Sequence, residues 1–132
     1  MVRVGGRTFT ALASQNLSLK ELNNYPLISL SDESMTRAFY RQFFLDHGAV
    51  LKPDTEAATT DQKLTLVKSA LGIAFLPQTM AQDALARGEI VQLHLQEIIP
   101  QRSICLVYDH HRPLHTAARK FRQMLTTAVP NC

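Results

Sequence analysis

The sequence contains few cysteines and no long hydrophobic run. Two of its 132 residues are cysteine, too few for the disulfide framework that stabilises small secreted domains. Cys105 lies inside the apolar run I-C-L-V, which indicates a small core residue, and Cys132 is the last residue. No apolar run approaches the roughly 20 residues that cross a bilayer, and the N-terminus lacks the apolar segment of a signal peptide. We therefore expect a protein of the reducing cytoplasm that has no membrane partner.

Catalytic signatures are lacking as well. The sequence has neither a glycine-rich phosphate-binding loop nor a G-x-G-x-x-G motif, and its serines do not stand in a G-x-S-x-G turn. His110, His111 and His115 lie close together, and imidazole is a common metal ligand. They do not form an i, i+4 pair with a glutamate between its members. We therefore expect no metal, no cofactor and no enzymatic activity.

The net charge of +3 is concentrated near the C-terminus. The first 100 residues hold nine basic and ten acidic residues, whereas five basic residues and one acidic residue follow from Gln101 onward. No helix-turn-helix or zinc-finger pattern is visible. This distribution favours a solvated face on a terminal helix, with a nucleic-acid or partner patch as the alternative.

The stretch Thr55–Pro77 has the clearest pattern, a strand followed by a helix and a second strand. Thr60 is expected to cap the helix, because its hydroxyl can accept an unbonded backbone N–H. Gly72 is expected to end the helix, since glycine adopts the left-handed conformation easily. Ile73–Leu76 is a continuous apolar run, which is typical of a strand covered on both faces.

Strands and helices alternate in the rest of the chain. The segment 1–6 is expected to be loose. The other expected strands are Arg7–Ala13, Leu27–Leu30, Ile90–Leu95 and Ser103–Tyr108, and the other expected helices are Leu19–Asn23, Met35–His47, Gln78–Arg87 and one that begins at Pro113. The alternation predicts an α/β fold whose mostly parallel sheet is flanked by helices.

Several pieces of sequence stand in the order and spacing of a known family. They are S-L-K-E-L-N-N-Y-P-L-I-S-L, S-M-T-R, A-T-T-D-Q-K-L-T-L-V-K-S-A-L-G-I-A-F-L-P, L-A-R-G-E-I-V-Q-L, I-C-L-V-Y and R-P-L-H-T-A-A-R-K-F. Residues from about Leu12 to Leu125 thereby resemble the C-terminal part of the effector-binding domain of LysR-type transcriptional regulators.

The resemblance implies one lobe of the periplasmic-binding-protein (type II) kind. Residues 1–132 would be a single fragment of the effector-binding domain. Residues 12–102 would form its second lobe, and residues 103–132 the return strand and the C-terminal helix. In this family a winged helix-turn-helix and a first lobe come before the part seen here, so these 132 residues are expected to hold no DNA-binding domain.

The resemblance also implies a sensing function. A small-molecule effector, such as an organic acid or an amino acid, would bind between two lobes and shift the population of their arrangements. The regulator would be a homo-oligomer that contacts DNA only through its N-terminal helix-turn-helix. The alternatives are a stand-alone small-molecule-binding α/β domain or a small enzyme, and an interaction module. The apolar stripe Leu114–Leu125 lacks the surface it packs on in the family, so self-association is expected.

The loop Ser31–Thr36 follows the expected strand Leu27–Leu30. In open α/β sheets, ligands bind outside the carboxyl ends of the strands, where helix N-termini favour anions. By the resemblance, Ser34 and Thr36 are candidate effector contacts, and Arg37 is a candidate charge partner. The alternative is that Ser34 only caps a helix and that Arg37 faces solvent.

A second helix start lies at Thr59 and Thr60, whose hydroxyl groups could bind an effector. Helix capping alone explains Thr60 equally well. The end of the following strand contributes Ile73 and Phe75, which could wall the cleft, although Phe75 is also a natural core residue. These are the remaining candidate effector-binding residues.

Overall fold

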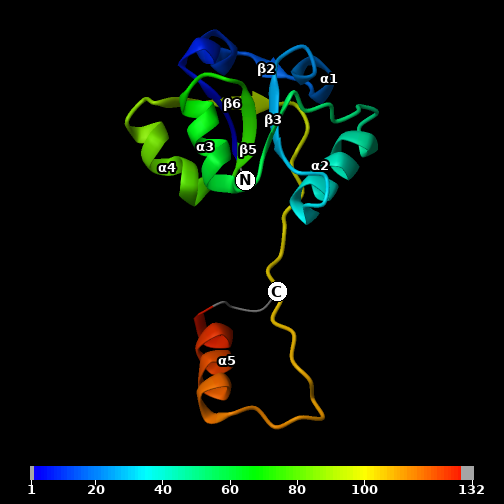
Figure 1. Cartoon of the computed structure of the whole chain (residues 1–132), viewed down its shortest axis with the longest axis vertical. Coiled ribbons are helices and arrows are strands. Elements are labelled where there is room, and N and C mark those ends of the chain that lie inside the picture. Colours follow the sequence, from blue (N-terminus) through cyan, green and yellow to red (C-terminus); the bar gives the residue numbers. More distant parts are fainter. Residues whose placement is uncertain (1, 129–132) are drawn as a thin grey trace. The chain divides into compact units, whose positions relative to one another are not determined.

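The computed structural model describes residues 2–128. The chain divides into two compact units, residues 1–100 and residues 101–132. The first unit is an α/β lobe and the second carries one helix (Figure 1). None of the helices in the described part has both the length and the apolar character that crossing a membrane requires.

Six strands form one mixed sheet in the order β2-β6-β1-β5-β3-β4. β3 pairs in parallel with β4 and β5, and β2 pairs in parallel with β6, whereas β1 runs antiparallel to both β5 and β6. The strands are β1 (Val2–Gly6), β2 (Asn16–Leu17), β3 (Leu27–Leu30), β4 (Thr55–Ala57), β5 (Ile73–Leu76) and β6 (Ile90–Leu95). The predicted α/β lobe with a mostly parallel sheet is confirmed.

Helices cover both faces of this sheet. Side chains of η1, α1 and α2 form one apolar cluster with the sheet, and side chains of α3 and α4 form a second one. The helices of the first unit are η1 (a 3-10 helix, Arg7–Ser14), α1 (Leu19–Leu22), α2 (Met35–Asp46), α3 (Thr60–Lys68) and α4 (Gln78–Ala86). Every residue of β3 and β5 is buried, as predicted for strands that are covered on both sides.

The predictions for the first 14 residues are wrong. The segment expected to be loose is β1, in the interior of the sheet, and the expected strand Arg7–Ala13 is the 3-10 helix η1. A Cβ atom on Gly6 would lie 2.6 Å from the Cα of Ala70, so glycine allows the strand to pack closely against the end of α3. In η1 only Leu12 is buried, which does not give the two-residue alternation of a half-buried strand.

Two predicted helix boundaries are also wrong. Thr59 caps α3, because its hydroxyl accepts the N–H of Gln62 at 3.3 Å, and Thr60 is the first residue of the helix. The helix ends before Gly72, with Ala70 in the left-handed conformation at a φ of 59°. Gly72 serves a different purpose, since a Cβ there would lie 2.7 Å from the carbonyl oxygen of Pro26.

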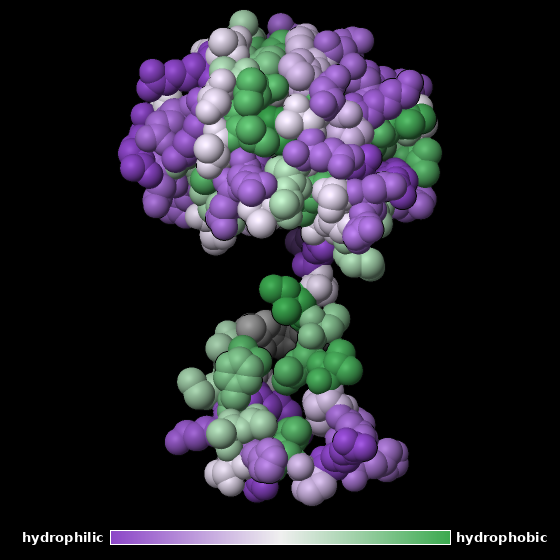
Figure 2. Space-filling view, in the orientation of Figure 1, coloured by the Kyte–Doolittle hydropathy of each residue, from purple (hydrophilic) through white to green (hydrophobic). Residues whose placement is uncertain are grey.

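The second unit contains α5 (Thr116–Ala128), which begins three residues after the expected start at Pro113. The prediction of a return strand at Ser103–Tyr108 is wrong, because these residues pair with no strand among residues 2–128. Ile104 is 99% exposed and Cys105 is exposed rather than buried in a core. Figure 2 shows apolar side chains on the surface of this unit. An apolar run becomes a strand only where a neighbour supplies hydrogen bonds.

Candidate functional site

The chain connections diverge at one point of the sheet, between β3 and β5. From β3 the chain continues through α2 to β4 on one side, and from β5 it continues through α4 to β6 on the other side. The helices α2 and α4 pack on opposite faces. In open α/β sheets such a switch point opens a crevice at the carboxyl ends of the strands, where ligands bind. This edge is therefore the candidate site.

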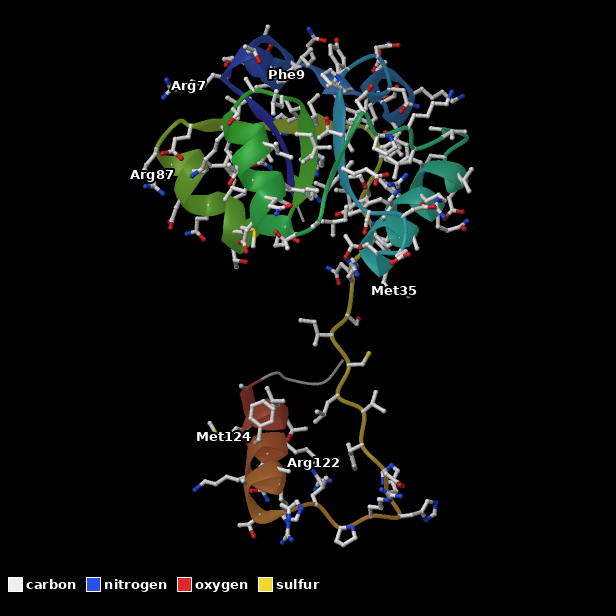
Figure 3. All side chains as sticks on the ribbon, viewed as in Figure 1. Arg7, Phe9, Met35, Arg87, Arg122 and Met124 are labelled. Atoms are coloured by element: carbon white, nitrogen blue, oxygen red, sulfur yellow. The ribbon has the colours of Figure 1, made fainter. Side chains whose placement is uncertain are left out.

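The N-terminus of α2 lies at this edge, directly after β3. The Ser34 hydroxyl accepts the backbone N–H groups of Thr36 at 3.2 Å and of Arg37 at 3.5 Å, so it caps the helix. Thr36 is half-buried in the first turn, and Met35 points outward at the surface (Figure 3). The serine hydroxyl still has a proton to donate, which leaves it able to contact a ligand while it caps.

Replacing Ser34 by alanine is expected to lower the free energy of unfolding by about 1 kcal/mol, because two N–H groups lose their acceptor. Ser34→Asn keeps a capping oxygen, so it is expected to retain most of that stability. Urea unfolding of both variants measures the difference. Equal losses in the alanine and asparagine variants would show that the cap contributes little.

Arg37 is held in place by three partners at the same edge. Its side chain is only 13% exposed, so the alternative of an arginine that faces solvent is wrong. Its guanidinium donates to the carbonyl oxygen of Leu30 at 3.2 Å, pairs with Glu56, and lies 3.5 Å from a carboxylate oxygen of Asp32. Because two carboxylates already balance its charge, Arg37 orients this loop more readily than it attracts an anion.

The N-terminus of α3 reaches the same edge from the neighbouring strand. β4 pairs with β3 up to Leu30 and Ala57, so Thr59 follows its strand on the same side as Ser34 follows β3. Thr59 is exposed and caps α3, whereas Thr60 is half-buried in the first turn. The two predicted helix starts therefore lie at the same edge of the sheet, although Thr59 rather than Thr60 is the N-cap of α3.

The structure separates the two candidate residues of β5. Ile73 begins the strand and pairs with Leu27, so it lies at the opposite edge of the sheet. Phe75 is 5% exposed, and its ring stacks on Tyr40 at 4.5 Å between centroids. Phe75 is thus a core residue directly beneath the candidate site, and Ile73 is distant from it.

Lys63 is a buried residue of this region that the sequence reasoning missed. It is 3% exposed, and its Nζ donates to the carbonyl oxygen of Phe75 at 2.6 Å, just beyond the last paired residues of β3 and β5. Burial lowers the pKa of its amine from 10.5 to about 8. Lys63 lies four residues before Val67 on the same face of α3, and this spacing was the sequence signal that could have indicated its burial.

A small cavity of about 10 Å³ lies beside this amine, lined by residues that include Ser29, Tyr40 and Lys63. That volume is close to the minimum for one water molecule. The cavity is therefore part of the interior rather than a ligand pocket.

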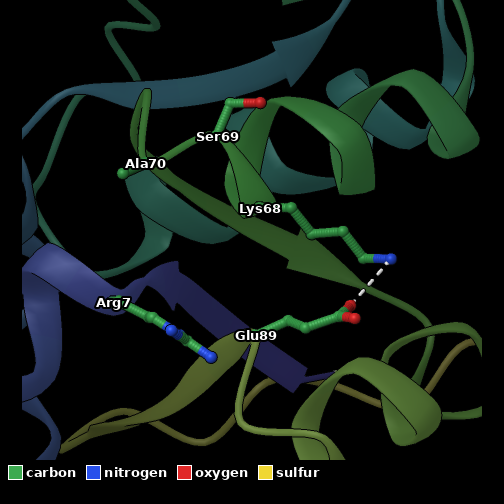
Figure 4. A pocket seen from close by; sticks show the side chains of 5 residues that line it. All are labelled: Arg7, Lys68, Ser69, Ala70 and Glu89. Carbon is green, nitrogen blue, oxygen red and sulfur yellow. Dashed lines mark ion pairs between the residues drawn. The ribbon is translucent and has the colours of Figure 1, made fainter.

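A wider hollow of about 440 Å³ lies at the opposite edge, between Arg7, Lys68, Ser69, Ala70 and Glu89 (Figure 4). Its charged groups already have partners. Lys68 contacts Glu89 at 2.9 Å, and this hydrogen bond lowers the pKa of the Glu89 carboxyl. Arg7 donates to the carbonyl oxygen of Gly88 at 2.8 Å. These paired charges make the hollow a weaker candidate for ligand binding.

The histidines of the second unit do not form a metal site within the described part of the chain, where no three His, Cys, Asp or Glu residues come together. The ring of His110 lies 4.9 Å from that of Tyr108, and the guanidinium of Arg122 lies 4.8 Å from the same tyrosine ring. These contacts are aromatic and cation–π interactions.

Comparison with known proteins identifies the fold and the family. The family model described as LysR substrate binding domain matches residues 4–130. A comparison with curated proteins gives no match.

Three solved structures illustrate the likeness. The regulatory domain of CcmR from Synechocystis PCC6803, in complex with 2-PG, is 19% identical with a TM-score of 0.79, and the match covers 98% of this chain and 62% of that one. The effector binding domain of QuiR, in complex with shikimate, is 18% identical with a TM-score of 0.73, covering 96% and 59%. A putative LysR family transcriptional regulator from Pseudomonas aeruginosa is 16% identical with a TM-score of 0.77, covering 98% and 48%.

The chain thus spans about half to three-fifths of the length of these structures. At such low identity the structural likeness establishes the fold. The family match covers nearly the whole sequence, in agreement with the order of its motifs. The chain belongs to the LysR substrate binding domain family.

Proposed function

We propose that this chain is the effector-sensing portion of a LysR-type transcriptional regulator, and that it binds a small molecule at the carboxyl edge of β3, β4 and β5. The observation that carries the proposal is the switch point at this edge, where the capped N-termini of α2 and α3 both lie. The LysR family consists of transcriptional regulators rather than enzymes, which removes the small-enzyme alternative.

The proposed contacts are the polar groups that the two helix starts present. Ser34 and Thr36 act from α2, and Thr59 and Thr60 act from α3. Arg37 holds the first of these loops in position through its ion pairs. Phe75 supports the site from below and does not touch the ligand.

The ligand proposed is a small organic acid or amino acid. The positive end of the helix dipole favours an anionic group at a helix N-terminus. One similar regulatory domain was solved with 2-PG and one similar effector binding domain with shikimate. DNA contact is assigned to the helix-turn-helix of such regulators rather than to these 132 residues. Self-association through the exposed apolar side chains of the second unit is part of the same proposal.

Titration of the 15N-labelled chain with a panel of small acids, amino acids and neutral analogues at millimolar concentration tests the site. At least one member is expected to shift the amide signals of Thr36 and Thr59, and to leave those of Lys68 and Glu89 at the opposite edge unchanged. Shifts confined to Lys68 and Glu89, or no saturable shift across the panel, would contradict the proposal.

A further inference from the structure

Arg3 is a cation at the candidate edge that neither the sequence motifs nor the helix starts account for. β1 runs antiparallel to β5, with Val2 opposite Leu76 and Arg3 opposite Phe75. The beginning of β1 therefore lies beside the carboxyl end of β5. Because residues that face each other across an antiparallel pair point to the same face, the side chain of Arg3 lies on the Phe75 side of the sheet, where α2 packs.

The charge of Arg3 is not balanced by a carboxylate. Among residues 2–128, no ion pair involves Arg3, and its buried Nε has no hydrogen-bond partner. The other arginines near this edge differ, since Arg37 pairs with Glu56 and Arg41 pairs with Asp32. An arginine stays protonated in proteins, so it cannot relieve this situation by losing its proton.

The surroundings of Arg3 connect it to the start of α2. Tyr40 stacks on Phe75, the residue opposite Arg3, and Thr36 precedes Tyr40 by one turn on the same face of α2. Burial lowers the pKa of the Arg3 guanidinium, while the nearby Tyr40 raises it. A partly desolvated cation is costly without a counter-charge, and an anion that binds beside it removes that cost.

We propose that Arg3 binds the carboxylate of the effector, so that the site takes a small organic acid and rejects its uncharged derivatives. The guanidinium presents several N–H donors in a fixed plane that matches a carboxylate, and such charge-assisted hydrogen bonds are about twice as strong as neutral ones. The inference rests on the proposed function, because it names the ligand class of the same site.

The test compares acids with matched neutral compounds: shikimate with methyl shikimate, and benzoate with benzamide. Binding is followed by the Nε–H signal of Arg3 and the amide signals of Thr36 and Thr59. We expect at least one acid to shift the Arg3 signal in a saturable way, and its neutral counterpart to bind at least tenfold more weakly.

Two variants of Arg3 and one control variant make the result specific. Arg3→Gln is expected to weaken binding of that acid about tenfold or more, and Arg3→Lys, which keeps the charge, to weaken it less. Arg87→Gln removes the same charge from the exposed end of α4 (Figure 3) and is expected to change binding less than twofold. The spectrum of each variant verifies that the lobe is folded.

The outcomes separate this inference from the proposed function. An acid that binds Arg3→Gln within twofold of its affinity for the unmodified chain would overturn the role of Arg3, as would equal binding of an acid and its neutral counterpart. In both cases shifts at Thr36 and Thr59 would leave the proposed site intact. A panel without any binding member would overturn both.

Discussion

Replacing Phe75 by alanine is expected to lower the free energy of unfolding by about 3–5 kcal/mol. The ring is 5% exposed, stacks on Tyr40 and meets the ring of Phe44 edge-on at 6.2 Å between centroids. Its removal leaves a cavity between α2 and the sheet. The rings of Tyr40 and Phe44 can fill this cavity only in part. Urea unfolding at pH 7 measures the loss.

Leu45→Ala provides the control for this substitution. Leu45 lies on α2, whose buried residues form the same cluster, but its side chain is 50% exposed. Leu45→Ala is expected to lose much less stability than Phe75→Ala, because half of the leucine already contacts water. Similar losses in the two variants would show that Phe75 is not a core residue. If Phe75→Ala kept its stability but lost ligand binding, the ring would belong to the site itself.

Raising the pH from 7 to about 10.5 is expected to stabilise the unmodified chain by about 3 kcal/mol relative to Lys63→Met. Burial lowers the pKa of the Lys63 amine from 10.5 to about 8, and each unit corresponds to about 1.4 kcal/mol. Below pH 8 both states are protonated, and the cost of burying the charge is fully present. Between the two pKa values the unfolded state binds more protons, so the stability contributed by this group rises with pH.

The measurement is the difference between the two unfolding free energies at each pH, from urea curves at several values between 7 and 10.5. Taking the difference cancels the contributions of groups that titrate alike in both proteins. Lys52→Met, which changes an exposed lysine, is the control and is expected to follow the unmodified chain. A difference between the unmodified chain and Lys63→Met that stays constant with pH would contradict the burial of a charged amine.

Elements whose local pattern agrees with their burial could be predicted from the sequence. The apolar runs Leu27–Leu30 and Ile73–Leu76 are strands covered on both faces, and Ile90–Leu95 alternates as expected. Ser18 and Glu21 form a capping box on α1, with both reciprocal hydrogen bonds present, and this S-x-x-E pattern is local in the sequence. In these cases neighbouring residues carry the information that determines the element.

Elements that depend on distant partners could not be predicted. β1 is short and ends in two glycines, so it resembles a loop until β5 and β6 supply its hydrogen bonds. The opposite error occurred at Ser103–Tyr108, where a strand-like composition has no neighbouring strand within residues 2–128. β propensity describes a fit to neighbouring strands more than a preference of the backbone itself.

The candidate site also combines features that local sequence predicts with features that depend on distant contacts. The helix starts at Ser34 and Thr59 could be located because caps are local and because the carboxyl edge of an α/β sheet is a general binding position. Lys63 and Arg3 could not be located, since their burial depends on how α3 and β1 meet the sheet. Charged side chains are mostly exposed, so the spacing of Lys63 and Val67 on one face of α3 is not enough to predict a buried lysine.

The position of β1 in the sheet has a consequence during synthesis. A ribosome makes β1 before the other strands of this sheet, yet Val2 pairs with Leu76 and Arg3 pairs with Leu93. The nascent chain therefore has to carry β1 without its neighbours until almost the entire lobe has emerged. Such pairing between distant residues raises the contact order and slows folding. Until β1 pairs with them, β5 and β6 have unpaired edges to which strands of other chains can add. Chaperones can protect a nascent chain in this state from aggregation.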